Sequence, residues 1–268
     1  MSNWKPFKDE KRGAVEDKMW VKNEKGETAL FKPYDEYKNP VGIEIEAYHI
    51  AKALGIPCAK IEEAVISGVD GIVSYDFRES EYTYCPGGRL WEKSQRLSLK
   101  RTDGDKHTLN KSGKPYGNIT IQDIQTDDRL KPLEKAIIEM LLFDSLVFNN
   151  DRHGANWEMK IDKNGRIKGL APLFDHGFCL NDAYANEVQF PWDKDGDDYV
   201  YLKHDNFFSR LCSHYPEQTA QFLERCSEIE LPDFCKMRLS AMKNINSFIN
   251  PPNIPNNTTN SMQAKKRR

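Results

Sequence analysis

The sequence lacks the long apolar runs and cysteine patterns that mark several classes of protein. No run of about 18 apolar residues occurs, and the first residues have no apolar core typical of a signal peptide. Six cysteines are scattered along the 268 residues, and none forms a C-x-x-C pair. We therefore expect no transmembrane helix, no zinc knuckle and no redox pair, and we expect free thiols in a cytoplasmic protein.

A net excess of one charge is also missing. The chain carries 39 Lys and Arg against 41 Asp and Glu, a formal net charge of -2, which argues against stable nucleic-acid binding. Apolar residues make up 38% of the sequence, and the mean hydropathy is -0.73. These values predict a water-soluble chain with a sizeable core, in one two-lobed domain or two small domains.

What the sequence does contain is an apolar segment, Leu133–Phe148, followed by a polar loop. The segment is apolar on almost all sides, which predicts a buried helix that supports the loop rigidly. The loop carries Asp151 and Asn156, and a predicted hairpin then leads to Asp175. Asp151 could accept a proton from a hydroxyl, whereas Asn156 and Asp175 could hold Mg²⁺ on a triphosphate.

An Asp and an Asn five positions apart are, taken alone, ordinary loop chemistry. The ordered combination is more specific: a buried helix, the pattern D-x-H-x-x-N, a hairpin, and the pattern L-x-P-L-F-D. Because phosphoryl transfer depends mostly on positioning and charge stabilisation, this combination favours a kinase. The relative geometry of these groups is the test that the sequence does not supply.

The N-terminal part predicts a hairpin, with strands over 19–22 and 28–32, preceded by a loop. Gly13 and Ala14 in that loop are small enough to let backbone N–H groups approach phosphate, although a plain surface loop has the same composition. Lys32 ends the second strand. It either points into a cleft to contact phosphates or is a solvated strand-end lysine.

A helix is predicted over 43–54, and its apolar residues form one face. Glu44 and Glu46 flank this face on opposite sides, so either could pair with Lys32. Strands are predicted at 64–66 and 71–75. The end of the second strand, at Tyr75, could lead across to another lobe and offer backbone groups to adenine.

The remaining segments are assigned by composition. Residues 84–121 are irregular and basic, which indicates a solvated insertion or a surface for a phosphate-rich or acidic substrate. An acidic and aromatic segment over 186–201 lies where kinases carry an activation or substrate-binding segment. A disordered basic tail is predicted at 251–268. Three helices precede that tail, over 205–213, 216–228 and 232–249.

These residues resemble the HipA-like serine/threonine kinases, including the CtkA-related members. The resemblance runs in order from Gly13 to about Ile249 and is strongest around the two motifs of the polar loop and hairpin. The resemblance implies a catalytic loop that contains Asp151 and His153, with Asp151 as the catalytic base. It further implies that the family's metal ligands are Asn156 and Asp175.

The same resemblance places the nucleotide contacts. The family's G-A-x-E loop over the nucleotide matches Gly13, Ala14 and the two residues after them, and its nucleotide lysine matches Lys32. Its glutamate before L-A-K-x-L-G falls on Glu44. HipA toxins carry an extra N-terminal subdomain, so this chain looks like a kinase core alone. Some relatives autophosphorylate on a serine in the nucleotide loop, but residues 5–27 contain no Ser or Thr.

We therefore predict an α+β, two-lobed protein-kinase-like fold. Residues 1–77 are expected to form a nucleotide-binding N-lobe with a small antiparallel sheet, and 78–250 a mainly helical catalytic C-lobe, with ATP and Mg²⁺ between them. The predicted reaction is γ-phosphoryl transfer to a Ser or Thr of an unidentified protein substrate or of the kinase itself. An antitoxin-like partner is left open, and no stable membrane binding is expected.

Two alternatives remain. The sequence Asp-Arg-His-Gly-Ala-Asn also resembles the D-R-H-x-x-N loop of phosphatidylinositol 3- and 4-kinases, which keeps a lipid kinase open. The acidic residues between 182 and 198 argue against it, because they would repel an anionic headgroup. A nucleotide-binding pseudokinase module is the second alternative. Four residues argue against it: Lys32, Asp151, Asn156 and Asp175.

Overall fold

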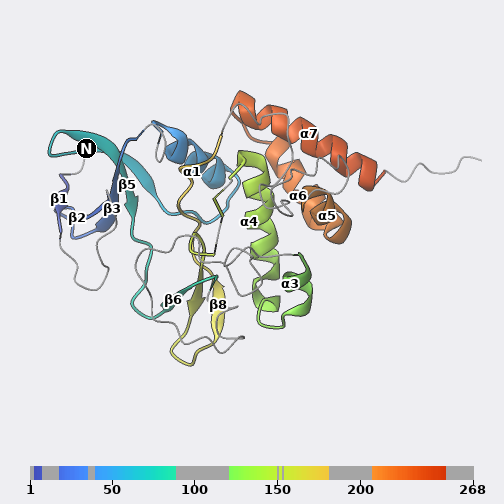
Figure 1. The fold of residues 1–268 in the computed structure, drawn as a ribbon, viewed down its shortest axis with the longest axis horizontal. Helices are drawn as coiled ribbons and strands as arrows, with labels where there is room; N and C mark the ends of the chain where they lie inside the picture. The colour runs from blue at the N-terminus through green and yellow to red at the C-terminus, as the bar shows by residue number, and fades with distance from the viewer. Residues whose placement is uncertain are drawn as a thin grey trace, which may run out of the picture.

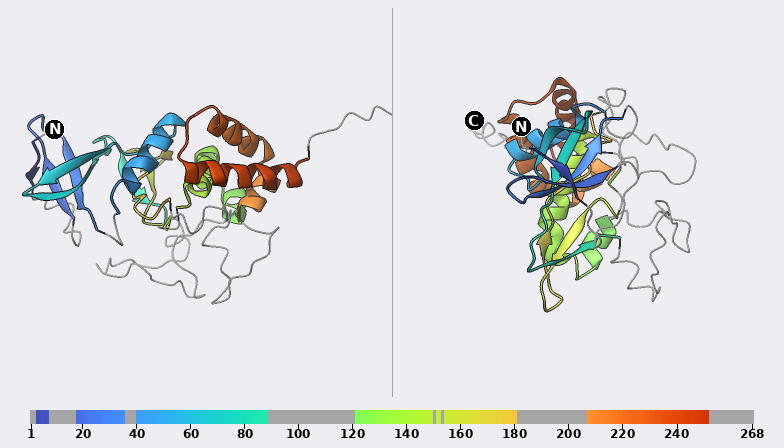
Figure 2. Two further views of the ribbon diagram at one scale, coloured as in Figure 1. Left: turned by 90° about the horizontal axis from the view of Figure 1, so that it is seen from above. Right: turned by 90° about the vertical axis from the view of Figure 1, so that its left-hand side faces the viewer.

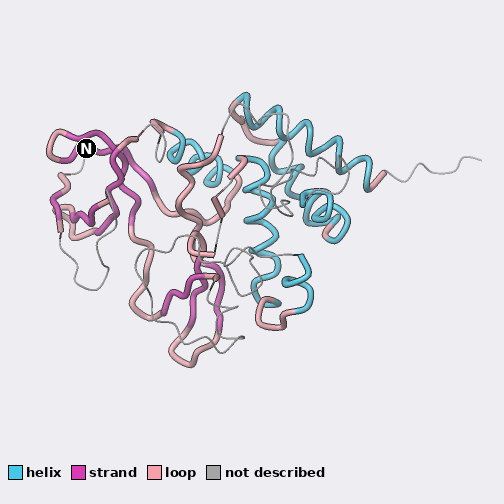
Figure 3. Tube along the Cα trace, in the orientation of Figure 1, coloured by secondary structure: helices cyan, strands magenta, loops and turns pink. Residues whose placement is uncertain are grey.

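The computed structural model describes residues 3–7, 18–35, 40–88, 121–149, 151–152, 154–180 and 207–251. It shows the predicted two-lobed α+β, kinase-like fold. Strands gather at one end and in the lower middle of the molecule, and helices fill the other end (Figures 1 and 3). Within these residues, no helix combines the length and the apolar character needed to cross a bilayer.

The small lobe is built on a five-stranded antiparallel sheet with the order β1-β2-β3-β5-β4. In β3, Phe31 is buried on the face that packs against the sheet's own core, and Lys32 is buried on the other face. The lysine is therefore directed away from the sheet core. The strands are β1 Lys5–Pro6, β2 Met19–Lys22, β3 Thr28–Pro33, β4 Ile61–Ile66 and β5 Val69–Tyr75.

Helix α1, Ile43–Ala53, links the two lobes. Its buried apolar residues belong to the core cluster of the helical lobe and not to the core of the sheet. Gly55 follows the helix with φ 71°, a conformation that glycine adopts readily. In Figure 1 and in the left view of Figure 2, α1 lies between the sheet and the helices of the second lobe.

The second lobe contains a three-stranded antiparallel sheet, β6-β7-β8, and helices around α4. Its strands are β6 Thr83–Pro86, β7 Glu158–Ile161 and β8 Ile167–Leu170. Its helices are α3 Ile121–Thr126, the 3₁₀ helix η1 Lys131–Leu133, α4 Glu134–Val147, α5 Phe207–His214, α6 Pro216–Ser227 and α7 Asp233–Ile249.

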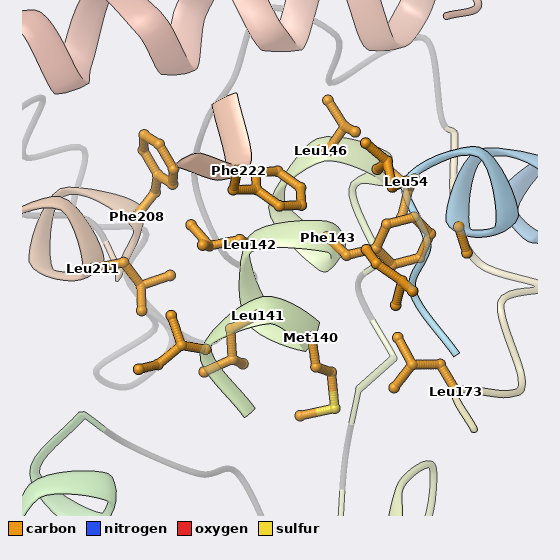
Figure 4. Packing of buried hydrophobic residues seen from close by; sticks show 14 of the residues in the cluster. Leu54, Met140, Leu141, Leu142, Phe143, Leu146, Leu173, Phe208, Leu211 and Phe222 are labelled. Carbon is orange, nitrogen blue, oxygen red and sulfur yellow. The ribbon is translucent and has the colours of Figure 1, made fainter. Parts of the chain in front are cut away.

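Helix α4 lies in the centre of the main core, as its sequence predicted. Figure 4 shows Phe143 of α4 beside Leu54 and Leu173, with Phe208 and Phe222 on the opposite side of the helix. All five side chains are buried, and each stabilises the fold by about 1.5–3 kcal/mol through removal of apolar surface from water. This packing on both sides fixes the helix whose C-terminal end leads into the polar loop.

Most predicted elements are present, and some bounds or assignments were wrong. The hairpin of β7 and β8 is confirmed, as is the buried helix before it. Residues 84–86 belong to β6, not to an irregular insertion, because β6 pairs with β7, a strand that lies far along the chain. Residues 89–120 of the basic stretch, the acidic segment 186–201 and residues 252–268 of the predicted tail lie outside the described residues. The division between lobes at residue 77 stays a prediction.

Candidate active site

Lys32 joins three separate elements in one ion cluster. Its Nζ donates to both carboxylate oxygens of Glu44 on α1, at 2.8 and 2.9 Å, and to Asp175 Oδ1 after β8, at 2.8 Å. Lys32 is 5% exposed and Glu44 2%. The structure therefore pairs Lys32 with Glu44, whereas Glu46 is exposed on the same helix.

The charges in this cluster stabilise one another. Burial by itself lowers the pKa of Lys32, but the carboxylates of Asp175 and Glu44 raise it above its ordinary value. Burial likewise opposes ionisation of Asp175, yet Lys32 and Lys18 hold the pKa of that carboxyl well below its usual range. Both groups are therefore charged at neutral pH. Asp175 is 31% exposed, and its Oδ2 has no partner in the described part of the chain.

The loop that presents Asp175 is fixed by the chain before it. Leu173 N donates to Pro57 O and Leu173 O accepts from Ala59 N, both at 2.8 Å. These bonds tie the loop to the segment that follows α1. Asp175 has φ 60°, a left-handed conformation that aspartate tolerates better than bulkier residues.

Asp151 and Asn156 are held together within the polar loop. Asn156 Nδ2 donates to the Asp151 carbonyl oxygen at 2.7 Å and to Asp151 Oδ2 at 3.1 Å. Both donor hydrogens of the amide are thus used inside the loop. Asn156 is 5% exposed, and its Oδ1 accepts no hydrogen bond from any described residue.

This donor set fits the ion that the sequence implied. Mg²⁺ binds oxygen ligands and is commonly held by one or two protein groups together with phosphate oxygens. Asn156 Oδ1 and Asp175 Oδ2 are two such oxygens without a partner among the described residues. The residues present are therefore compatible with Mg²⁺, which these two side chains would hold.

Tyr75 lies at the end of β5, where its hydroxyl, ring and N–H contact residues 60 and 62. Its hydroxyl donates to Glu62 Oε2 at 2.7 Å, its ring lies 4.1 Å from Lys60 Nζ, and its N–H bonds Lys60 O. The N–H of Phe77, two residues on, meets no acceptor among the described residues. The Phe77 ring lies 5.6 Å from that of Phe174, next to Asp175. The expected contact of the chain at Tyr75 with adenine stays a prediction.

Three other predicted site residues fall outside the described part of the chain. They are Gly13 and Ala14 of the first loop and His153 of the polar loop. Their expected roles stay predictions.

Sequence reasoning missed Arg152, Asp144 and His176, which form a buried network behind the polar loop. The side chains of Arg152 and Asp144 are wholly buried and paired, with 2.9 Å between Arg152 Nε and Asp144 Oδ2. His176 is 0% exposed. The signal available was Asp144 itself, a charged residue inside an otherwise apolar helix, because such a residue needs a buried partner.

The sequence also gave no role to Gly87 and Gly88, which contact the polar loop. Gly87 N donates to Trp157 O, and Gly88 N donates to Gly154 O, both at 2.9 Å. A Cβ at Gly87 would lie 2.0 Å from the Trp157 ring. The close approach of these strands therefore requires glycine at this position.

We expect Gly87→Ala to lower the free energy of unfolding by about 1–3 kcal/mol, the range typical of overpacking in a close-packed interior. Chemical denaturation monitored by Trp fluorescence measures it. Gly169→Ala in β8 is the matched control, since a Cβ there meets no atom within 4 Å. Equal stability of the two variants would show that the Trp157 ring moves aside at little cost.

No protein-family model matches this sequence. The serine/threonine-protein kinase CtkA of Helicobacter pylori is 30% identical over 150 residues, which cover 54% of this chain and 42% of that protein. The match thus spans less than half of the relative's length.

Solved structures extend the comparison. The crystal structure of the Helicobacter pylori proinflammatory kinase CtkA aligns with a TM-score of 0.60 at 18% identity, over 92% of this chain and 93% of that one. HipA in the Shewanella oneidensis complex with HipB and operator DNA aligns with a TM-score of 0.41 at 16% identity, over 83% and 50%. The predicted resemblance to HipA- and CtkA-related kinases is therefore confirmed through CtkA, to which this chain is similar in sequence over about half of its length and in fold over nearly all of it.

Proposed function

We propose that this protein is an ATP- and Mg²⁺-dependent kinase that transfers the γ-phosphoryl group to a Ser or Thr hydroxyl of a protein. The observation that carries the proposal is the ion cluster in which Lys32 binds both Glu44 and Asp175. It joins a buried cation to a partly exposed carboxylate from a distant part of the chain. The similarity to a serine/threonine-protein kinase supports the same reaction and acceptor.

In the proposed reaction, Asp151 accepts the proton of the acceptor hydroxyl while its oxygen bonds to the γ-phosphorus. The bond from that phosphorus to the bridging oxygen breaks, and ADP leaves. Lys32 supplies a preorganised positive charge to the phosphates. Asn156 and Asp175 would hold Mg²⁺, and the bound ion would supply positive charge to the phosphates.

Other assignments are proposed on the sequence alone. Gly13 and Ala14 contact the nucleotide phosphates, His153 belongs to the catalytic loop, and the chain at Tyr75 lines the adenine site. A cytoplasmic location and an antitoxin-like partner are proposed on the same basis.

One observation favours a lipid kinase as the alternative. The sequence Asp-Arg-His at 151–153 resembles the D-R-H-x-x-N loop of phosphatidylinositol 3- and 4-kinases. The acidic segment that argued against a lipid acceptor lies at 182–198, outside the described residues. The choice between acceptors therefore depends on experiment.

The test offers radiolabelled ATP and Mg²⁺ with basic proteins and, separately, with liposomes containing phosphatidylinositol. We expect label on Ser or Thr of protein, either the added substrate or the kinase itself, and about 10²- to 10⁴-fold less when Asp151→Asn replaces the wild type. If the label enters the lipid fraction and this labelling is lost in Asp151→Asn, the protein is assigned as a lipid kinase instead of a protein kinase. Tight Mg·ATP binding with no transfer to either acceptor would favour the nucleotide-binding module.

A further inference from the structure

Arg152 is a charged side chain that the proposed chemistry does not use, although it lies beside the proposed base. It is 1% exposed. Its Nε and Nη2 donate to the two carboxylate oxygens of Asp144 on α4, at 2.9 and 3.0 Å. Asp144 is held in turn by Asn149 Nδ2 at 3.0 Å. The guanidinium is therefore fixed on one side by the buried helix.

The other side of the same guanidinium faces the two segments that carry the proposed metal ligands. Arg152 Nη1 donates to the carbonyl oxygen of Asn156 at 2.5 Å and to that of Phe174 at 3.0 Å. Phe174 immediately precedes Asp175. A single nitrogen atom thus bonds the main chain of one ligand and the main chain next to the other.

His176 completes the arrangement. Its Nε2 lies 2.9 Å from Arg152 Nη2, and arginine has no acceptor, so Nε2 accepts this hydrogen bond. With Nε2 as the acceptor, the ring proton lies on Nδ1, a buried atom with no hydrogen-bond partner among the described residues. Its edge-to-face contact with Phe143 of α4, at 5.6 Å between ring centroids, fixes the orientation of the ring.

We propose that Arg152 is a positioning residue that sets the separation of Asn156 and Asp175 and thereby determines the affinity of the site for Mg²⁺. This inference rests on the proposed function, because it needs those two residues as metal ligands. Arginine suits the role because its donors lie in a rigid planar fork that reaches Asp144 and both carbonyl oxygens together. A lysine ammonium keeps the charge but cannot make all these contacts from one atom.

The test compares Arg152→Lys with the wild type by calorimetric titration of ATP over a series of Mg²⁺ concentrations. Loss of a group that orients metal ligands typically weakens metal affinity by about 10- to 100-fold. We expect the Mg²⁺ concentration for half-maximal ATP affinity to rise by that factor, with affinity for metal-free ATP unchanged. No turnover is needed for this measurement.

Arg238→Lys is the matched control. Arg238 is buried like Arg152, at 0% exposed. Its Nε donates to Ser145 O on α4, and its guanidinium lies over the Phe148 ring. Both variants lose a buried guanidinium that supports α4, so both are expected to be less stable. We expect only Arg152→Lys to change the Mg²⁺ requirement.

If Arg152→Lys folds and has the wild-type Mg²⁺ requirement, the positioning role is overturned. If Arg238→Lys raises the Mg²⁺ requirement by the same factor, the effect is general destabilisation and the proposal is likewise overturned. Failure of the wild type itself to bind Mg·ATP would instead remove the proposed function.

If Arg152→Lys does not fold, His176→Phe and His176→Gln take its place. Both alter the neighbour of Asp175, but only Phe removes the acceptor for Arg152. A Mg²⁺ requirement that rises in His176→Phe but not in His176→Gln supports the proposal. The same Mg²⁺ requirement in both variants contradicts it.

Discussion

Asp151→Asn is expected to reduce phosphoryl transfer by about 10²- to 10⁴-fold, the usual contribution of a general base. The amide has nearly the same shape as the carboxylate and can still accept from Asn156 Nδ2, as Asp151 Oδ2 does at 3.1 Å. It cannot take up the proton of the acceptor hydroxyl. The affinity for Mg·ATP is therefore expected to stay close to that of the wild type.

Single-turnover transfer and calorimetric nucleotide binding, measured on the same preparation, separate these effects. Asp162→Asn is the control, because Asp162 accepts backbone hydrogen bonds from Asn164 and Arg166 in the β7–β8 turn. We expect normal transfer and normal binding from it. Normal transfer by Asp151→Asn would exclude Asp151 as the base, and a loss of binding equal to the loss of transfer would make it a nucleotide-positioning residue instead.

Lys32→Met is expected to have two separable effects. It removes a preorganised charge at the phosphates, which we expect to cost about 10²-fold or more in transfer. It also leaves Glu44, 2% exposed, as a buried carboxylate without its partner. Breaking a buried ion pair on one side typically destabilises a protein by about 3–5 kcal/mol.

The double variant Lys32→Met/Glu44→Gln distinguishes these effects. Replacing the carboxylate by a neutral amide removes the unpaired charge, so we expect much of the lost free energy of unfolding to return while transfer stays low. Glu46→Gln, an exposed change on the same helix, should leave both stability and transfer unaltered. Recovery of transfer in the double variant would mean that Lys32 acts only through stability, and near-normal transfer by Lys32→Met would exclude it from the phosphate site.

Local sequence patterns predicted much of the fold. The apolar residues of 133–148 indicated a helix buried on most sides, and the pattern after it indicated a hairpin that returns Asp175 towards the polar loop. Both features are present. The hydrogen bonds from Asn156 to Asp151 then bring together two residues that the motif had singled out. Their chemical roles stay predictions.

The same local patterns did not predict contacts between segments that are distant in the sequence. β6 was missed because a short strand is stabilised by its partner, here β7, and the partner is far away in the sequence. Gly87 was overlooked for the same reason, since the need for glycine comes from the Trp157 ring across the sheet. Arg152 received no role because its partner Asp144 lies on the preceding helix, and the motif does not show that the two side chains meet.

The sequence by itself determined which residue types are available: an apolar helix, a loop with Asp151 and Asn156, a strand with Lys32, and a helix with two candidate glutamates. Only the tertiary structure decided that Lys32 pairs with Glu44 and that α1 shares its core with α4. The physical reason is that periodicity specifies which face of an element is apolar, but not what that face packs against. A buried charge is tolerable only beside its partner, and the partners of Lys32 and Arg152 are supplied by the fold.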